Sequence, residues 1–248
     1  MNVVEIIFSP TGGTWKAADM IGGHLSGNIT QIDLSNAKTD FTKCEIKQED
    51  MVLVAMPSFG GRAPAVAIER FRKIQGNGAR CTIVCVYGNR AYEDTLVEME
   101  DAAREAGFRV IAAVAAVAEH SIMPQYAANR PDAADEKQLA GFAARIASRD
   151  ENAVSIPGNR PYKKSGGAGL VPKPTKDCVK CGLCAEKCPV QAIDSANFTA
   201  DSKKCIACMR CVKQCPQNAR KVNGVMVSVA AMAIKKACSV RKGNELFL

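Results

Sequence analysis

Aromatic side chains are scarce in this sequence of 248 residues: they make up 5% of it, and there is a single Trp and only two His. The net charge of +8 is not accompanied by the interleaved aromatics on which nucleobases stack. Long apolar runs are missing too, since the longest, VIAAVAAVA at 110–118, is far shorter than the roughly 20 residues of a transmembrane helix. We therefore expect no nucleic-acid partner and no membrane span.

Two common nucleotide fingerprints are absent as well. The sequence has neither the G-x-G-x-x-G turn of dinucleotide-binding folds nor the loop with a following Lys-Ser/Thr that cradles ATP. The first residues run directly into an apolar stretch, without a basic segment or a cleavage site. This pattern lacks the marks of an export signal, so we expect a cytoplasmic location.

Cysteine, by contrast, is abundant, and its placement is uneven. Eight of the twelve cysteines fall between Cys178 and Cys215, where CVKCGLCAEKCPVQAI at 178–193 recurs 27 residues later as CIACMRCVKQCPQNAR at 205–220. In a reducing compartment this density indicates metal or redox chemistry rather than disulfides. The other four we expect to behave as small buried hydrophobic residues: Cys44, Cys81, Cys85 and Cys238.

Each repeat reads C-x2-C-x2-C-x3-C-P, the spacing of bacterial-type iron–sulfur runs, in which the fourth cysteine ligates the other cluster. On that rule, cluster A takes Cys178, Cys181, Cys184 and Cys215, and cluster B takes Cys205, Cys208, Cys211 and Cys188. A structural zinc module is the competing interpretation, although zinc sites usually come as paired C-x2-C knuckles. Residues 176–228 resemble the bacterial two-cluster ferredoxin family, which implies a small α+β domain with two [4Fe–4S] clusters. One departure is Arg220, which stands where an apolar residue is common and could raise the potential of cluster A.

The first 149 residues alternate strand-like and helix-like stretches. Strands are predicted near 3–9, 29–35, 51–57, 80–87 and 110–119, and helices near 14–26, 64–75, 93–106 and 132–149. Because parallel neighbours need crossover connections, this alternation predicts an α/β fold with a doubly wound parallel sheet.

Between the first strand and the first helix lies the stretch SPTGGT at 9–14. A tight glycine turn that opens a helix is an arrangement that binds phosphate. Hydroxyl groups come from Ser9, Thr11 and Thr14, while Gly12 and Gly13 let backbone N–H groups approach; the absence of charge suits a phosphomonoester. The loop resembles the phosphate loop of the flavodoxin family, which implies a five-stranded sheet of order 2-1-3-4-5 and flavin mononucleotide (FMN) as cofactor.

Two further loops leave the same edge of the predicted sheet, at 56–64 and 86–94. By the resemblance, these loops flank the isoalloxazine ring of the flavin. Their candidate binding residues are Ser58, Phe59, Gly60, Gly61, Tyr87, Gly88, Asn89 and Tyr92. Arg62 and Arg90 in the same loops are interpreted as solvated surface.

The order of segments predicts four parts: 1–149 as the flavin domain, 150–175 as a linker, 176–228 as the ferredoxin domain, and 229–248 as a C-terminal helix and tail. The combination resembles the flavodoxin–ferredoxin fusion proteins of anaerobic bacteria and archaea. This implies an electron-transfer protein that passes electrons between FMN and two [4Fe–4S] clusters and on to a redox partner. The alternative is an FMN-dependent reductase that oxidises NAD(P)H or reduces a small oxidant. The loops show no evident acid–base pair, and we assign no catalytic residue.

Charge in the ferredoxin region favours an acidic partner, a ferredoxin or a flavoprotein. Residues 176–228 hold nine basic and four acidic residues, a net charge of +5, whereas small ferredoxins are usually acidic. We expect association with this partner to be steered electrostatically. The sequence leaves open whether flavin and clusters meet within one chain or across a homodimer.

Overall fold

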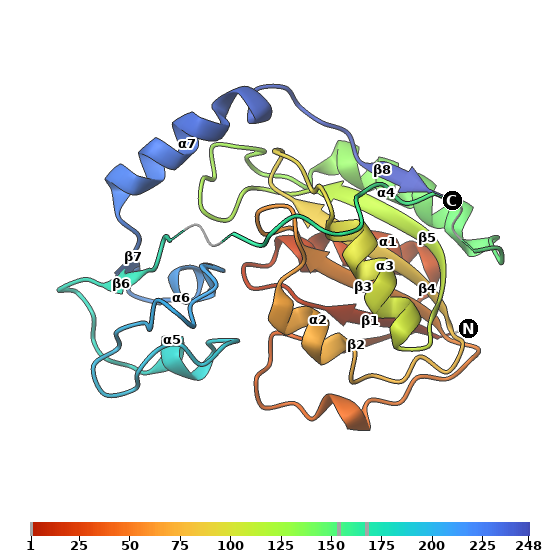
Figure 1. Cartoon of the computed structure of the whole chain (residues 1–248), viewed down its shortest axis with the longest axis horizontal. Coiled ribbons are helices and arrows are strands. Elements are labelled where there is room, and N and C mark those ends of the chain that lie inside the picture. The colour runs from red at the N-terminus through yellow and green to blue at the C-terminus, as the bar shows by residue number, and fades with distance from the viewer. Residues whose placement is uncertain (1, 153–154, 167–168) are drawn as a thin grey trace.

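A twisted sheet forms the centre of the larger part of the chain (Figure 1). The computed structural model describes residues 2–152, 155–166 and 169–248. Its parallel strands are β1 (Val3–Ile7), β2 (Ile29–Asp33), β3 (Met51–Pro57), β4 (Arg80–Tyr87) and β5 (Arg109–Val117). They are ordered β2-β1-β3-β4-β5, which is the predicted order.

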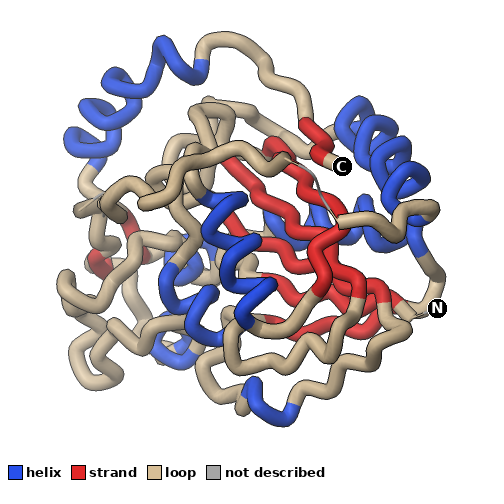
Figure 2. The backbone as a smooth tube through the Cα atoms, turned by 45° about the vertical axis from the view of Figure 1, so that its right-hand side comes forward, coloured by secondary structure: helices blue, strands red, loops and turns tan. Residues whose placement is uncertain are grey.

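Helices cover both faces of this sheet (Figure 2). On one face, α1 (Gly13–Leu25) packs beside α4 (Ala133–Ala147), and on the other α2 (Ala65–Phe71) packs beside α3 (Thr95–Glu105). Strands β1, β3, β4 and β5 are buried on both faces, which explains why they read as continuous apolar runs rather than as alternating patterns, whereas the edge strand β2 is partly exposed. Cys81 and Cys85 of β4 are fully buried within this core, as expected.

Most predicted boundaries agree with the structure to within two residues, and α2 is the main exception. It ends at Phe71 rather than at 75 because the next backbone bonds, Lys73 N–H to Arg70 and Ile74 N–H to Phe71, close tight turns that lead into Gly76. A short 3-10 helix, η1 (Phe41–Lys43), was not predicted.

The cysteine-rich region has little regular structure. Its elements are β6 (Lys173–Pro174) paired antiparallel with β7 (Arg220–Lys221), and the single-turn helices α5 (Leu183–Glu186) and α6 (Arg210–Lys213). Among the described residues, the buried apolar cluster of this region contains Cys188, Ala192 and Ile193, and only partly buried side chains pack against it. So small a core stabilises the region weakly, and bound inorganic clusters would supply the missing cross-links.

The C-terminal residues return to the sheet. Helix α7 (Gly224–Cys238) begins at the side-chain cap of Asn223 and arches from the cysteine-rich region to the sheet (Figure 1). Beyond it, β8 (Glu245–Phe247) pairs antiparallel with β5 and adds a sixth strand that sequence reasoning missed.

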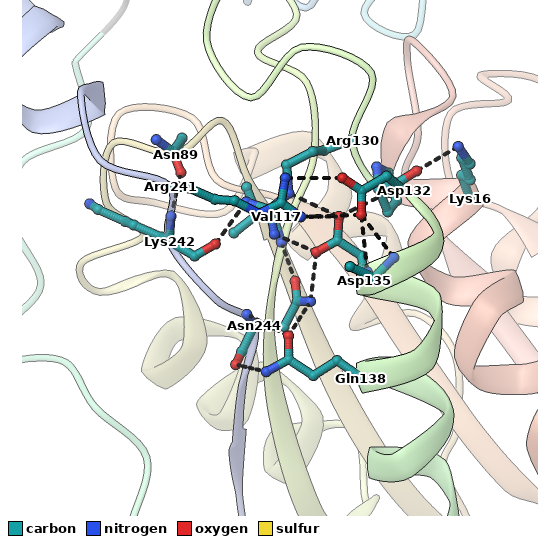
Figure 3. Close-up of polar contacts among 12 residues, drawn as sticks. Lys16, Asn89, Val117, Arg130, Asp132, Asp135, Gln138, Arg241, Lys242 and Asn244 are labelled. Atoms are coloured by element: carbon teal, nitrogen blue, oxygen red, sulfur yellow. Dashed lines mark hydrogen bonds and ion pairs between the residues drawn. The ribbon is translucent and has the colours of Figure 1, made fainter.

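A buried polar network fastens β8 to the sheet (Figure 3). Asn244 accepts a hydrogen bond from the Val117 backbone N–H at 2.8 Å and donates to Asp135 at 3.0 Å. Asp135 also forms a buried ion pair with Arg130, and Gln138 closes the network through three hydrogen bonds with Asn244. Every member is paired, so the network joins β5, α4 and the tail as one unit.

The predicted linker packs on the surface of the part of the chain that contains the sheet. Asp94 accepts hydrogen bonds from the backbone N–H groups of Asn159 (2.9 Å) and Lys163 (2.7 Å). Arg62, expected on a solvated surface, instead forms a half-buried bidentate pair with Glu98 and lies over the Tyr162 ring. Residues 153, 154, 167 and 168 of the linker lie outside the described residues. Within the described ranges, none of the helices has the length and apolar character to cross a membrane.

Candidate functional site

The eight clustered cysteines separate into two groups of four, each around its own cavity. Cavity A is lined by Cys178, Cys181, Cys184 and Cys215, together with Phe198 and Arg220 among others. Three of these cysteines come from the first repeat and the fourth from the second, as the exchange rule predicts. The four cysteines line one cavity, an arrangement that suits a polynuclear cluster.

Cavity B has the reciprocal composition and a more enclosed setting. It is lined by Cys188, Cys205, Cys208 and Cys211, with Ile206, Met209 and Arg210 beside them. Cys208 of cavity B is so enclosed that burial raises the pKa of its thiol to about 12. In cavity A, by contrast, Cys181 is exposed to solvent. The described residues contain no group of three His, Cys, Asp or Glu placed to hold one metal ion.

The two repeats have the same backbone conformation. Lys180 and Ala207, which occupy equivalent positions, have φ of 57° and 51°, and the helix caps Gly182 and Met209 have φ of 80° and 61°. Left-handed residues disfavour a regular helix, so each cysteine loop is held in a compact turn.

The fourth cysteine of each repeat accepts a similar backbone bond. Ala192 N–H donates to Cys188 Sγ at 3.3 Å, and Ala219 N–H donates to Cys215 Sγ at 3.2 Å. Hydrogen bonds to sulfur orient the ligand and tune a bound centre.

Arg220 is the largest fully buried side chain of the described structure, 2% exposed. Its guanidinium donates to the carbonyls of Phe198 (2.8 Å) and Pro172 (2.9 Å) and approaches Cys184 Sγ at 3.7 Å. Its positive charge acts to lower the pKa of Cys211, although burial raises the pKa of that thiol overall. No carboxylate bonds to Arg220 within the described residues, so its charge faces the cysteines.

The loop at 9–14 has the geometry of an anion cradle. Helix α1 starts at Gly13, and Gly12 precedes it with φ of 95°, a conformation that favours glycine. Ser9 Oγ accepts from the Trp15 backbone N–H at 3.0 Å and so closes the loop on itself. The backbone N–H groups of residues 11–14 have no acceptor among the described residues, and these free donors lie at the positive end of the α1 dipole.

The cysteine-rich region contacts the part of the chain that contains the sheet, beside this loop. Arg210, which lines cavity B, donates to the Ser9 carbonyl at 3.4 Å, and its Nη2 lies 3.9 Å from Asp33. Arg70 of α2 donates to the Pro189 carbonyl, which also borders cavity B, and to the Leu34 carbonyl, each at 2.6 Å. Ile206 packs against the buried core on one face of the sheet. Cavity B therefore lies at the junction, beside the 9–14 loop.

The loop after β3 is partly engaged in internal contacts. Ser58 accepts a hydrogen bond from the Thr95 hydroxyl at 2.8 Å, and Phe59 and Arg62 close a turn through Gly60 and Gly61, whose φ values are positive. Ser58 N–H also bonds to Val86 of β4, so the loops after β3 and β4 lie side by side.

The residues after β4 lie toward the C-terminal tail. Tyr87 is buried and packs edge-on against Tyr92, whose hydroxyl bonds to Glu245 of β8 at 2.6 Å. Burial raises the pKa of Tyr87 to about 12. The Asn89 side chain donates to the carbonyls of Cys238 and Val240. The structure thus brings Tyr87, Asn89 and Tyr92 together around the tail, while Gly88 lies against His120.

A model of the 4Fe–4S binding domain matches this chain twice, at residues 172–194 and 198–221. This segment is a ferredoxin-type 4Fe–4S binding domain. It adjoins a sheet whose order, 2-1-3-4-5, is the flavodoxin-like one. The chain thus combines a flavodoxin-like fold with a ferredoxin-type iron–sulfur segment.

Several solved flavodoxins are similar to the first part of the chain. Flavodoxin 1 of Bacillus cereus is 16% identical, with a TM-score of 0.43 over 61% of this chain and 100% of its own. The Megasphaera elsdenii flavodoxin is 17% identical, with a TM-score of 0.40 over 58% and 98%. A flavodoxin from the domain Archaea is 13% identical, with a TM-score of 0.42 over 59% and 96%. No curated protein sequence matches the chain.

Sequence reasoning missed Arg210 and Arg70 as residues of the site. Arg210 is 201 positions from Ser9, and nothing in the local pattern of either links them. Their meeting depends on how the two parts of the chain pack.

Proposed function

We propose that this chain is an electron-transfer protein that holds FMN at the 9–14 loop and two [4Fe–4S] clusters in cavities A and B, and that passes electrons to a partner protein. The observation that carries this proposal is the position of cavity B: four cysteines from the two repeats surround it, and its border residue Arg210 contacts the 9–14 loop.

The cysteine ligands follow from the two cavities. Cluster A would be held by Cys178, Cys181, Cys184 and Cys215, and cluster B by Cys205, Cys208, Cys211 and Cys188. Two matches to the 4Fe–4S model, one to each repeat, support two clusters. Thiolates suit iron–sulfur centres, and each cavity offers four.

The 9–14 loop fits the phosphate of FMN. Free N–H groups at residues 11–14 supply donors, and Gly12 leaves open space, because a Cβ built there would meet nothing within 4 Å. The ring would extend along the adjacent loops, where Ser58, Phe59, Gly60, Gly61 and Gly88 are candidates. Tyr87, Asn89 and Tyr92 support the same edge from the tail side.

Bound flavin can exchange two electrons and bound clusters one at a time, which is the chemistry that such a pair supplies. The contacts of the two cavities indicate the order in which electrons would pass between flavin, clusters and partner. Arg70, Arg210 and Ile206 hold cavity B against the proposed flavin domain, which supports electron exchange within one chain. Cavity A is bordered by the exposed Cys181 and by Val179, which is 62% exposed. We therefore assign cluster B as the cluster that exchanges electrons with the flavin, and cluster A as the cluster that passes them to the partner protein.

The test is an anaerobic titration of the as-purified chain, followed by its visible spectrum. NADH or NADPH is added first, and a reduced low-potential ferredoxin second. For an electron carrier, nicotinamides leave the spectrum unchanged, and the ferredoxin bleaches flavin and cluster bands together.

Two other results would contradict this proposal in different ways. Flavin bleaching by a nicotinamide at catalytic rates would establish the reductase alternative. A purified chain that lacks flavin bands and does not regain them with added FMN would remove the flavin assignment, while the clusters would be tested separately by iron content.

A further inference from the structure

We propose that Arg210, which belongs to the 4Fe–4S region, is a ligand of the flavin phosphate, so that the iron–sulfur region completes the flavin site. The inference rests on the proposed function, because it takes the 9–14 loop as the phosphate cradle. It goes beyond that function because it gives a role in flavin binding to an arginine that lies outside the flavodoxin-like fold.

The hydrogen-bond donors of Arg210 are poorly satisfied for so enclosed a side chain. The side chain is 13% exposed, and its Nε atom is buried without a hydrogen-bond partner among the residues that the structure describes. Its contacts are the Ser9 carbonyl at 3.4 Å and the Asp33 carboxylate at 3.9 Å, both long for charged donors. A guanidinium has five N–H donors, and leaving them unpaired away from water is unfavourable. The geometry therefore leaves donors available for a further acceptor beside Ser9.

The charge around the loop points to an anion. Arg210 and Arg70 lie at the junction with Asp33 as their carboxylate neighbour. Burial lowers the pKa of Arg70, and the charge of Asp33 opposes that shift. Asp33 is itself occupied by the Ser35 backbone N–H at 2.7 Å, and Arg70 bonds to carbonyls. Glu69 also acts on Arg70. Among the described residues, the carboxylate paired with Arg210 is Asp33 at 3.9 Å, so a phosphate would give the Arg210 guanidinium a closer anionic partner.

The loop and the arginine complement each other. The free N–H groups of residues 11–14 supply neutral donors from one side, and Arg210 supplies a charged fork at Ser9, where the loop begins. Because the loop itself is uncharged, Arg210 would be the charged ligand of the dianion. Flavin binding and docking of the 4Fe–4S region would then stabilise each other, since the same arginine takes part in both.

The test compares FMN with riboflavin, which carries the same ring without the phosphate. The flavin-free full-length chain with its clusters intact is titrated with each by fluorescence quenching. Arg210→Gln should weaken FMN binding at least about tenfold and leave riboflavin affinity within about twofold, since only FMN carries the charge that the arginine would meet. Lys213→Gln, an equal change of charge at an exposed site on the same helix α6, is the matched control and should alter neither.

Each outcome decides a specific point. Equal weakening of FMN and riboflavin in Arg210→Gln would show that the residue acts through docking alone and overturn the inference, as would no change in either. A wild-type chain that binds neither flavin would instead overturn the proposed function, and the inference with it. If the Gln variant loses its clusters, Arg210→Lys gives the same comparison with the charge retained, and a smaller loss confined to FMN supports the inference.

Discussion

The guanidinium of Arg220 lies 3.7 Å from the Sγ atom of Cys184, although 36 positions separate the two residues. Their proximity arises because β7 pairs with β6 and carries Arg220 inward, where the carbonyls of Phe198 and Pro172 hold it. A buried positive charge therefore stands beside a ligand of cavity A. The reduced form of a cluster carries more negative charge than the oxidised form, so this cation should stabilise it.

We expect Arg220→Met to lower the potential of cluster A, by tens of millivolts up to about 100 mV if the effective dielectric constant is about 20. Potentiometric titration followed by electron paramagnetic resonance would measure the shift. Arg220→Lys keeps the charge and should move the potential less. An unchanged potential in the Met variant, with both clusters present, would contradict the electrostatic role.

Because the fourth cysteine of each repeat borders the cavity of the other repeat, cysteine variants should lose clusters in an unusual pattern. Cys215→Ser should disturb the same cluster as Cys178→Ser, although Cys215 lies in the second repeat, because both border cavity A. Cys188→Ser should likewise behave as Cys205→Ser does. Iron content and the resonance spectrum of each single variant would be compared. Pairing of Cys215→Ser with Cys205→Ser would contradict the assignment.

Glu5 should make stability depend on pH. It is fully buried in β1, its Oε1 atom has no hydrogen-bond partner in the part of the chain that the structure describes, and burial raises its pKa from 4.5 to about 7. The folded state thus holds the proton more tightly than the unfolded state. The contribution of Glu5 to the free energy of unfolding is therefore largest below pH 4.5. It falls between pH 4.5 and 7 and then levels off.

Replacing Glu5 by Gln should therefore stabilise the chain at pH 8, by on the order of 1–3 kcal/mol, and change little at pH 5. Anaerobic thermal unfolding at the two pH values would measure this difference. The exposed Glu49→Gln serves as the control. Equal effects of Glu5→Gln at both pH values would argue against a buried titrating carboxyl.

The polar network around Asn244 predicts that its mutation destabilises the pairing of β8 with β5. Asn244→Ala would leave the Val117 N–H and one Asp135 contact unpaired (Figure 3), at a cost of about 2–3 kcal/mol. Hydrogen exchange at the Val117 amide should accelerate as β8 detaches, while the exposed Gln48→Ala should leave it unchanged. Unaltered exchange at Val117 in Asn244→Ala would show that strand pairing alone holds the tail.

Basic residues near cavity A should steer an acidic partner. With a reduced acidic ferredoxin as probe, the association rate constant should fall about tenfold as salt is raised from low to high concentration. Exchanging the exposed Lys176 and Lys180 for Glu should reduce both the rate and its salt dependence. The exposed Lys137→Glu on α4 is the control. A rate indifferent to ionic strength would count against electrostatic docking.

Local patterns in the sequence were enough for much of the fold. Alternation of apolar runs and amphipathic stretches predicted five parallel strands and four helices, because each signal is contained within about ten residues. The three residues of β8 are too short to signal a strand, and they become one because β5 offers an unpaired edge. The prediction that Arg62 lies on a solvated surface was wrong for a similar reason. Its ion-pair partner Glu98 and the Tyr162 ring that it contacts come from distant segments.

By itself, the sequence predicted the two sets of four cysteines and the 9–14 loop, because both are short motifs whose spacing implies a ligand geometry. Only the tertiary structure decided that Arg210 meets Ser9, that Arg220 is buried beside Cys184, and that Asn89 binds the tail. These contacts join residues tens to hundreds of positions apart. They depend on how whole elements pack, and no local periodicity carries that information.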